Sequence, residues 1–189
     1  MARIEGVLDG LTDDADQSER VRHASLSIQA HRPEMAAALD GFRVAMKTQR
    51  TLPPRLAELV RLRIAFHNQC RSCMSIRYQD ALDDGLNEDL VCSLEKPYEA
   101  PDLTDAERVA LRYADAFATN HLAIDDAMHA ELREYFDEGE VVELGLWCAL
   151  CVGFGRLSAT WHMVDDLPED YAADGTITPW GNDDVVVMR

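Results

Sequence analysis

The stretch from Glu58 to Tyr78 reads ELVRLRIAFHNQCRSCMSIRY and places Cys70 and Cys73 three positions apart. Its apolar first half predicts one helix that is interrupted at Asn68-Gln69, and a second helix is expected to start near Arg71. Side chains three apart on a helix are neighbours, with about 5–6 Å between Cβ atoms, so a small adjustment brings two sulfurs within disulfide distance. Free N–H groups at a helix start also favour a thiolate. The pair therefore suits reversible redox chemistry.

Two charged side chains are expected near this pair. Arg77 follows Cys73 by four residues, so its fixed positive charge is predicted to stabilise a Cys73 thiolate. It cannot act as a general base near neutral pH, because a guanidinium stays protonated. Glu58 lies one helix earlier, and in apolar surroundings its carboxyl group would favour the neutral form and pass a proton.

Structural roles are the alternatives for the residues of this stretch. The alternative for the cysteines is a pair of inert helix residues, and the alternative for Glu58 is an ion pair with Arg61 or Arg77. His67 precedes Cys70 by three residues, which makes it a candidate for the site, but a histidine at a helix end also commonly bonds a carbonyl group.

Outside this stretch the sequence is helical in pattern throughout. Strand-like alternation is almost absent, and prolines, a Gly and a Thr-x-x-Glu capping box mark helix ends. We expect one all-α domain of six to eight helices over residues 1–164. The expected helices are 18–31, one opened by Pro33, one after Pro53-Pro54, 71–82 ending at Gly85, a short one from Asn87 to Leu94, one behind Thr104, 124–136, and 140–163.

The helix predicted at 140–163 is apolar on every face in its middle, LGLWCALCVGF. Such a helix normally lies at the centre of a bundle or at a subunit interface. The tail, residues 165–189, is acidic and contains two prolines and two glycines, so we expect it to be irregular. Its Tyr171, Trp180 and Val185-Val186-Val187 predict that it packs on the body or on a neighbouring subunit.

Composition excludes several classes of protein. The 189 residues include 35 acidic and 18 basic ones, for a net charge of −17, which disfavours nucleic acid and anionic membranes as partners. Five cysteines are too few for a secreted disulfide scaffold and favour a reducing cytoplasm. The N-terminus lacks the apolar segment of a signal peptide, and the longest uncharged apolar run, Leu144 to Gly155, is shorter than the ~20 residues of a membrane span.

The remaining candidates are weaker. Cys148 and Cys151 form a second Cys-x-x-Cys, but its apolar helix predicts core cysteines rather than a zinc site, and Cys92 is expected to be core as well. The glycines of Gly153-Phe154-Gly155 predict close helix packing. No spacing of the histidines indicates a metal site, and no cofactor is expected; His162 is a candidate for lining a pocket.

The spacing Glu58-x11-Cys70-x2-Cys73 resembles the motif of the AhpD-like alkylhydroperoxidases of the carboxymuconolactone decarboxylase superfamily. Four flanking segments over residues 30–160 are also similar to that family: HRPEMAAALDGF, LPPRLAELVRLR, LTDAERVALRYADA and VVELGLWCALCVGFGRL. The resemblance implies an all-helical bundle that assembles into trimers or higher oligomers, with a dimer as another option.

The resemblance also implies a thiol-dependent hydroperoxide reductase. Cys73 would be the peroxidatic cysteine, Cys70 would resolve the sulfenic acid to a disulfide, and Glu58 would belong to the proton relay. The implied partners are a hydroperoxide and a dithiol reductant, lipoyl or thioredoxin-like. The sequence departs from the family at two relay histidines, which are Ser72 and Arg77 here, and His67 is the candidate substitute.

Two other functions remain open. A decarboxylase or lactone-processing enzyme of the same superfamily would need an acid–base pocket and an anion-binding group, for which Arg77, Arg156 and His162 are candidates. A non-catalytic thiol redox sensor or oligomeric binding protein would be consistent with the loss of both relay histidines.

Overall fold

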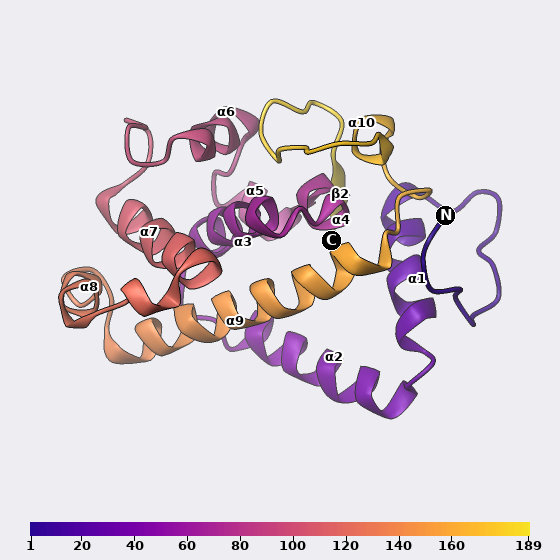
Figure 1. The fold of residues 1–189 in the computed structure, drawn as a ribbon, viewed down its shortest axis with the longest axis horizontal. Helices are drawn as coiled ribbons and strands as arrows, with labels where there is room; N and C mark the ends of the chain where they lie inside the picture. The colour runs from indigo at the N-terminus through magenta and orange to yellow at the C-terminus, as the bar shows by residue number, and fades with distance from the viewer.

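Helices form most of the molecule, which a computed structural model describes over residues 1–189. The chain is therefore mostly helical, as predicted, but it has more helices than the six to eight expected, because several are one or two turns long (Figure 1). The α-helices are α1 (Gln17–Gln29), α2 (Pro33–Thr48), α3 (Pro54–Asn68), α4 (Arg71–Ser75), α5 (Gln79–Asp83), α6 (Glu88–Cys92), α7 (Asp105–Thr119), α8 (Asp126–Leu132), α9 (Glu138–Trp161) and α10 (Glu169–Ala172). Two 3₁₀ turns, η1 (Ser93–Glu95) and η2 (His121–Ala123), and two strands, β1 (Ile76–Tyr78) and β2 (Val186–Met188), complete it.

Helix starts follow the local signals in the sequence. Pro33 and Pro54 stand at the first position of α2 and α3, where a missing N–H costs nothing. Thr104 and Glu107 form the predicted capping box of α7, each side chain accepting from the other residue's backbone N–H. The Asn87 side chain accepts from Leu90 N at the start of α6, also as predicted.

The centre of the core is α3. Leu59, Val60, Leu62 and Ile64 of this helix have no exposed surface, and α7 and α9 pack against it. Burying each such side chain stabilises the fold by about 1.5–3 kcal/mol. The helix that carries the Glu58 end of the motif is thus buried at the centre of the core.

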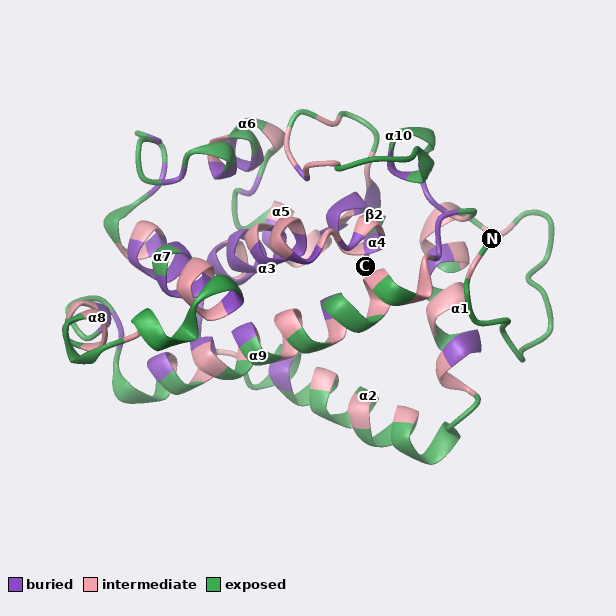
Figure 2. Cartoon of the chain, viewed as in Figure 1, coloured by how far each residue is buried: buried purple, intermediate pink, exposed green.

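The long apolar helix α9 is not at the bundle centre. Its buried side includes Val141, Leu144 and Cys148, whereas Val142 and Leu146 are 61% and 46% exposed. Figure 2 shows buried, intermediate and exposed stretches alternating along α9. The exposed Val142 and Leu146 leave apolar surface open on the single chain, and the second prediction for this helix, a subunit interface, stays a prediction. By length and composition α9 also qualifies as a possible membrane span, which corrects the expectation that no segment is long enough; a core helix of a soluble protein passes the same test.

Gly155 of α9 marks a close approach to α3. A Cβ atom at this position would lie 2.4 Å from the side-chain nitrogen of Asn68, so no other residue fits without movement. The same amide donates to the carbonyl of Cys151 at 2.9 Å. The prediction of close packing therefore holds for Gly155, while a Cβ at Gly153 would meet nothing within 4 Å.

The prediction of one helix over residues 71–82 is wrong. The helix that begins at Arg71 ends at Ser75, and the chain continues as β1. β1 pairs in parallel with β2 near the C-terminus, with Ile76 opposite Val186 and Tyr78 opposite Met188. A strand needs a partner, and here the partner is more than a hundred residues away in sequence. This parallel pair is also the exception to the all-α expectation.

The tail packs on the body, as predicted. Tyr171, Val186 and Met188 are buried and share a second apolar cluster with Val21 of α1 and Met74 of α4. The tail runs along the outside of the molecule from α10 and returns to β1 beside α4 (Figure 1). The division of the chain at residue 164 stays a prediction.

Candidate functional site

A sharp break between α3 and α4 creates the cysteine loop. Gln69 ends α3 in the left-handed conformation, with φ 49°, and Cys70 is the N-cap of α4. The Gln69 side chain donates to Phe66 O at 2.9 Å and Ile177 O at 3.1 Å and accepts from Ile177 N at 3.2 Å. These bonds hold an uncommon backbone conformation and tie the tail to the loop.

Cys70 and Cys73 are joined by a disulfide across this loop, with their Cα atoms 5.2 Å apart. The two cysteines differ in exposure. Cys70 is fully buried, and its sulfur lies 3.6 Å from the hydroxyl oxygen of Ser72. Cys73 is half-buried and lines a cavity of about 550 Å³. Only the second cysteine of the pair is therefore open to a ligand in the cavity.

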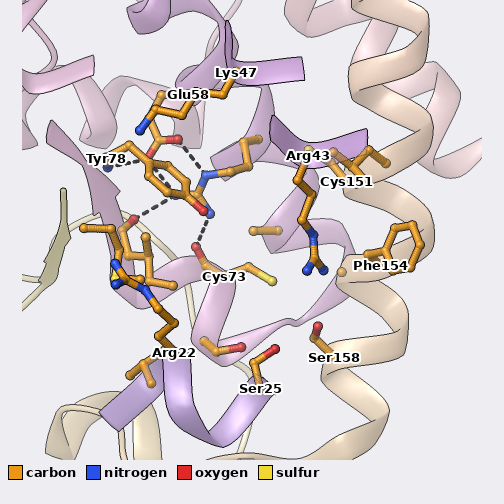
Figure 3. Close-up of a pocket in the computed structure, with 18 of the residues that line it drawn as sticks. Arg22, Ser25, Arg43, Lys47, Glu58, Cys73, Tyr78, Cys151, Phe154 and Ser158 are labelled. Atoms are coloured by element: carbon orange, nitrogen blue, oxygen red, sulfur yellow. Dashed lines mark hydrogen bonds and ion pairs between the residues drawn. The ribbon is translucent and has the colours of Figure 1, made fainter. Parts of the chain in front are cut away.

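Elements from both halves of the chain form this cavity. Figure 3 shows the Cys73 and Arg43 side chains both extending into the space beside Phe154 of α9. Glu58 and Arg61 of α3 and Tyr78 of β1 contribute to another part of the wall. The site thus combines the cysteine loop with α1, α2, α3 and α9.

Glu58 forms a buried, bidentate ion pair with Arg61. Arg61 Nε and Nη2 each donate to a Glu58 oxygen at 2.6 Å, and both side chains are less than a tenth exposed. Burial lowers the pKa of Arg61, but the Glu58 charge raises it by more, so the guanidinium stays protonated. Of the alternatives for Glu58, the structural ion pair with Arg61 is the one that the structure contains.

Arg61 extends this pair to the cysteine loop. Its remaining donors reach Cys73 O at 2.5 Å and Ile76 O at 2.8 Å, and its guanidinium lies 5.1 Å from the centre of the Tyr78 ring. Tyr78 N donates to Glu58 at 3.3 Å. The pair therefore connects the central helix to both ends of the segment that carries Cys73.

Arg77 does not take the place predicted for it. Since the helix ends at Ser75, the four-residue helical spacing to Cys73 does not exist, and Arg77 does not line the cavity. Its fully buried guanidinium donates to Glu88 at 2.9 Å, to Met74 O at 2.7 Å and to Pro179 O at 2.7 Å. Arg77 connects β1 to α6 and to the tail.

His67 also lies outside the cavity. Its Nε2 is 2.6 Å from the carboxylate of Asp115 on α7, which also accepts from Arg63 at 2.7 Å and from the Tyr98 hydroxyl. Burial raises the pKa of Asp115, but the hydrogen bonds that it accepts lower it by more, to about 2. His67 thus takes the structural alternative, with a carboxylate as its partner, and is not placed to replace the missing histidines.

The low pKa of Asp115 predicts acid-sensitive stability. Because the folded-state pKa of about 2 lies below the ordinary 3.8, the carboxylate stabilises the fold above about pH 4, and this contribution is lost as the pH falls through 2. We expect the loss in unfolding free energy caused by Asp115→Asn to shrink by about 2 kcal/mol between pH 6 and pH 2. Urea denaturation of both proteins at the two pH values measures it, and an equal loss at both would contradict the assignment.

Sequence reasoning did not assign Tyr78, Cys151 or Arg43 to the site. Burial raises the pKa of Tyr78, so its hydroxyl stays protonated at neutral pH and is available as a donor. Cys151, expected to be core, is half-buried at the cavity wall, and burial raises its pKa to about 12, so it remains a thiol. No local signal identifies these three, because they come from three separate elements.

Other candidates lie away from the cavity. Arg156 donates to Asn68 at 3.2 Å and to Ala118 O at 2.6 Å, and His162 ends α9 in the left-handed conformation. Neither residue lines the cavity. Cys148 is buried as predicted, but Cys92 is exposed on α6, contrary to the expectation of a core cysteine.

Comparison with known proteins finds a family model that matches the central part of the chain. Residues 33–116 match the model of the carboxymuconolactone decarboxylase family. An uncharacterized protein of Mycobacterium tuberculosis is 42% identical over 118 residues, which are 60% of this chain and 40% of that protein. The uncharacterized protein YnjA of Escherichia coli is 29% identical over 117 residues, 62% of either chain. The matched segment thus spans less than two thirds of these relatives.

Two solved structures share the fold. The alkylhydroperoxidase AhpD core of an uncharacterized peroxidase-related protein from Ralstonia eutropha superposes with a TM-score of 0.68 at 17% identity, covering 94% of this chain and 97% of that one. A protein of unknown function from Agrobacterium tumefaciens gives a TM-score of 0.62 at 22% identity, covering 71% and 92%. At these identities the likeness concerns the fold.

Proposed function

We propose that this chain, whose residues 33–116 match the model of the carboxymuconolactone decarboxylase family, is a thiol-dependent hydroperoxide reductase. The observation that carries the proposal is the asymmetric disulfide, in which Cys73 lines a cavity and Cys70 is buried behind it. A nucleophile must meet its substrate, whereas a resolving thiol needs only to reach the nucleophile. Cys73 is therefore the peroxidatic cysteine and Cys70 the resolving one.

The proposed reaction passes through two covalent changes at Cys73. The thiolate attacks one peroxide oxygen; the S–O bond forms, the O–O bond breaks, and the released alkoxide takes a proton to leave as an alcohol. The Cys70 thiol then attacks the Cys73 sulfenic acid, which forms the disulfide and releases water. A dithiol reductant restores both thiols by exchange and is itself oxidised to a disulfide.

Tyr78 and Glu58 both line the cavity, and we assign them different roles in this reaction. Tyr78 retains its proton at neutral pH and lines the same cavity as Cys73, so we assign it as the proton donor to the alkoxide. Both carboxylate oxygens of Glu58 accept hydrogen bonds from Arg61 in the buried ion pair. We therefore assign Glu58 to holding the cysteine loop through Arg61 rather than to the proton relay that the family resemblance implies.

The proposed partners follow from the reaction and the surface. The reductant is a lipoyl or thioredoxin-like dithiol, and the cellular location is the cytoplasm, where thiols are kept reduced. Exposed apolar residues on α9 and α2, among them Val142, Leu146, Met35 and Val44, support a homo-oligomer, for which light scattering should give a mass of two or more chains. The net charge of −17 supports a protein that binds neither nucleic acid nor anionic membranes.

Mapping of the cysteines tests the proposed function directly. The protein is reduced with dithiothreitol, separated from it, treated with tert-butyl hydroperoxide, alkylated and analysed by mass spectrometry. We expect one Cys70–Cys73 disulfide for each hydroperoxide consumed, while the exposed Cys92 remains available to the alkylating reagent. Folded protein in which Cys70 and Cys73 stay reduced would exclude the function.

A second candidate function is a lactone-processing decarboxylase, supported by the family match and by the basic side chains of the cavity. That chemistry needs no thiol pair, so the double variant Cys70→Ser/Cys73→Ser would retain it. A redox sensor would instead form the disulfide once per chain, without continued hydroperoxide consumption in the presence of excess dithiol.

A further inference from the structure

The cavity beside Cys73 has a charge opposite to that of the chain. The whole chain has 35 acidic and 18 basic residues, but the residues lining the cavity include six basic and three acidic side chains. The basic ones are Arg22, Arg43, Lys47, Arg50, Arg61 and Arg189, and the acidic ones are Asp40, Glu58 and Asp80. A basic cavity inside an acidic molecule concentrates anions at one place.

Only part of this positive charge is neutralised. Arg61 pairs with Glu58 at 2.6 Å and Arg50 with Asp80 at 2.8 Å. Arg22, Arg43 and Lys47 form no ion pair within 4 Å, and Asp40 forms none either. Arg189 apart, the cavity side chains without an ion pair are three cations, Arg22, Arg43 and Lys47, and one carboxylate, Asp40. All four lie on the α1 and α2 side of the cavity.

Arg43 is the free cation best placed to bind a ligand. It is half-buried, its one side-chain hydrogen bond is to the Gln29 amide oxygen at 3.3 Å, and its guanidinium lies 5.6 Å from the Phe154 ring centre. Burial lowers the pKa of Arg43, and the charges of Tyr78 and Asp40 offset this only in part, since no carboxylate lies within ion-pair distance of the guanidinium. Most of its five N–H donors therefore remain for a ligand.

The wall next to Arg43 is apolar. Trp147, Leu150 and Phe154 of α9 face the cavity, and Leu26 and Val44 contribute from α1 and α2. A volume of about 550 Å³ lies within the range of roughly 300–1,000 Å³ typical of small-molecule sites. The cavity therefore offers a cationic anchor, an apolar surface and a reactive sulfur in one space (Figure 3).

We propose that this cavity binds organic hydroperoxides that carry a carboxylate, with the carboxylate held by Arg43 and Lys47, the hydrocarbon part on α9 and the peroxide group at Cys73. The proposal rests on the proposed hydroperoxide chemistry and adds the substrate class to it. Arginine suits a carboxylate because its planar fork can donate two parallel hydrogen bonds. The reaction balances as above, with the hydroperoxide reduced to its alcohol and the two thiols oxidised.

Equilibrium binding tests the anion site without any turnover. Octanoate and octanol are titrated into the oxidised protein by calorimetry, with Arg43→Gln as the variant and Arg32→Gln as the control. Arg32 is exposed just before α2 and does not line the cavity, so the control removes the same charge from the same region. We expect octanoate to bind about tenfold or more weakly to Arg43→Gln, and to bind the control as it binds wild type.

Lys47 is exposed, so Lys47→Gln carries little risk to folding. This second variant should also bind octanoate more weakly than wild type. Equal affinities for octanoate and octanol, or an octanoate affinity unchanged in both variants, would overturn the site.

Measurements of turnover test the proposed substrate class independently of the anion site. Linoleic acid hydroperoxide and its methyl ester are compared in wild type with dithiothreitol as reductant. We expect kcat/KM to favour the acid about tenfold, and Arg43→Gln to reduce that ratio. Equal kcat/KM values for acid and ester would overturn the substrate class. If neither hydroperoxide is reduced while octanoate still binds through Arg43, the proposed function fails and the anion site stands.

Discussion

Cys73→Ser is expected to lower kcat/KM for hydroperoxide reduction by roughly a thousandfold or more, to the level of the uncatalysed reaction. The structure gives the reason, because Cys73 is the only member of the disulfide that lines the cavity. A serine hydroxyl has nearly the same shape as a thiol but is not ionised near neutral pH and is a poor nucleophile toward peroxide. The fold should be unaffected, since a half-buried cysteine is replaced by a slightly smaller residue.

Cys70→Ser distinguishes the two cysteines. It should still reduce one hydroperoxide per chain and then stop with a sulfenic acid on Cys73, which dimedone traps and mass spectrometry locates. Cys92→Ser, at an exposed position of α6, is the matched control and should turn over normally. A dimedone adduct on Cys70 in the Cys73→Ser protein would reverse the assignment of peroxidatic and resolving roles.

The helix ends were predictable because their causes are local. The prolines at the start of α2 and α3 act within one turn, and so does the capping box of Thr104 and Glu107. The spacing of Cys70 and Cys73 is likewise local, and the disulfide that it suggested is present. In each case the atoms that interact are within a few residues of one another in the chain.

Features that depend on distant partners were not predictable. The segment after Ser75 is a strand because β2 pairs with it, and the free energy of that pairing is not contained in residues 71–82. Arg77 was placed near Cys73 on the assumption of a continuous helix, whereas it lies on β1 and bonds α6 and the tail. The same limitation applies to Arg43, whose role depends on α2 lying opposite the cysteine loop.

Some contacts of Arg61 are local and predictable, and others depend on distant partners. Its ion pair with Glu58 spans three residues and was one of the alternatives open from the sequence. Its bonds to Cys73 O and Ile76 O arise only when α3 packs beside the cysteine loop. The function proposed for the pair, positioning the nucleophile, therefore requires the structure.

Arg61→Leu is expected to destabilise the protein by about 3–5 kcal/mol, the usual cost of breaking a buried ion pair from one side. The substitution leaves the Glu58 carboxylate buried without its partner and removes the donors to Cys73 O and Ile76 O. Urea denaturation measures the loss, and Arg133→Leu is the control, because the Arg133–Glu138 pair is exposed and should change the midpoint little.

A second substitution separates the unpaired charge from the lost loop contacts. In Arg61→Leu/Glu58→Leu no buried charge is left without a partner, so the double variant should be more stable than Arg61→Leu alone. The backbone carbonyls of Cys73 and Ile76 remain without their donor in both variants. If Arg61 positions the nucleophile, the double variant regains stability but not peroxidase activity. If the double variant regains both stability and peroxidase activity, the pair contributes to folding alone. If Arg61→Leu lowers the free energy of unfolding by less than about 1 kcal/mol, the pair is not buried as the structure has it.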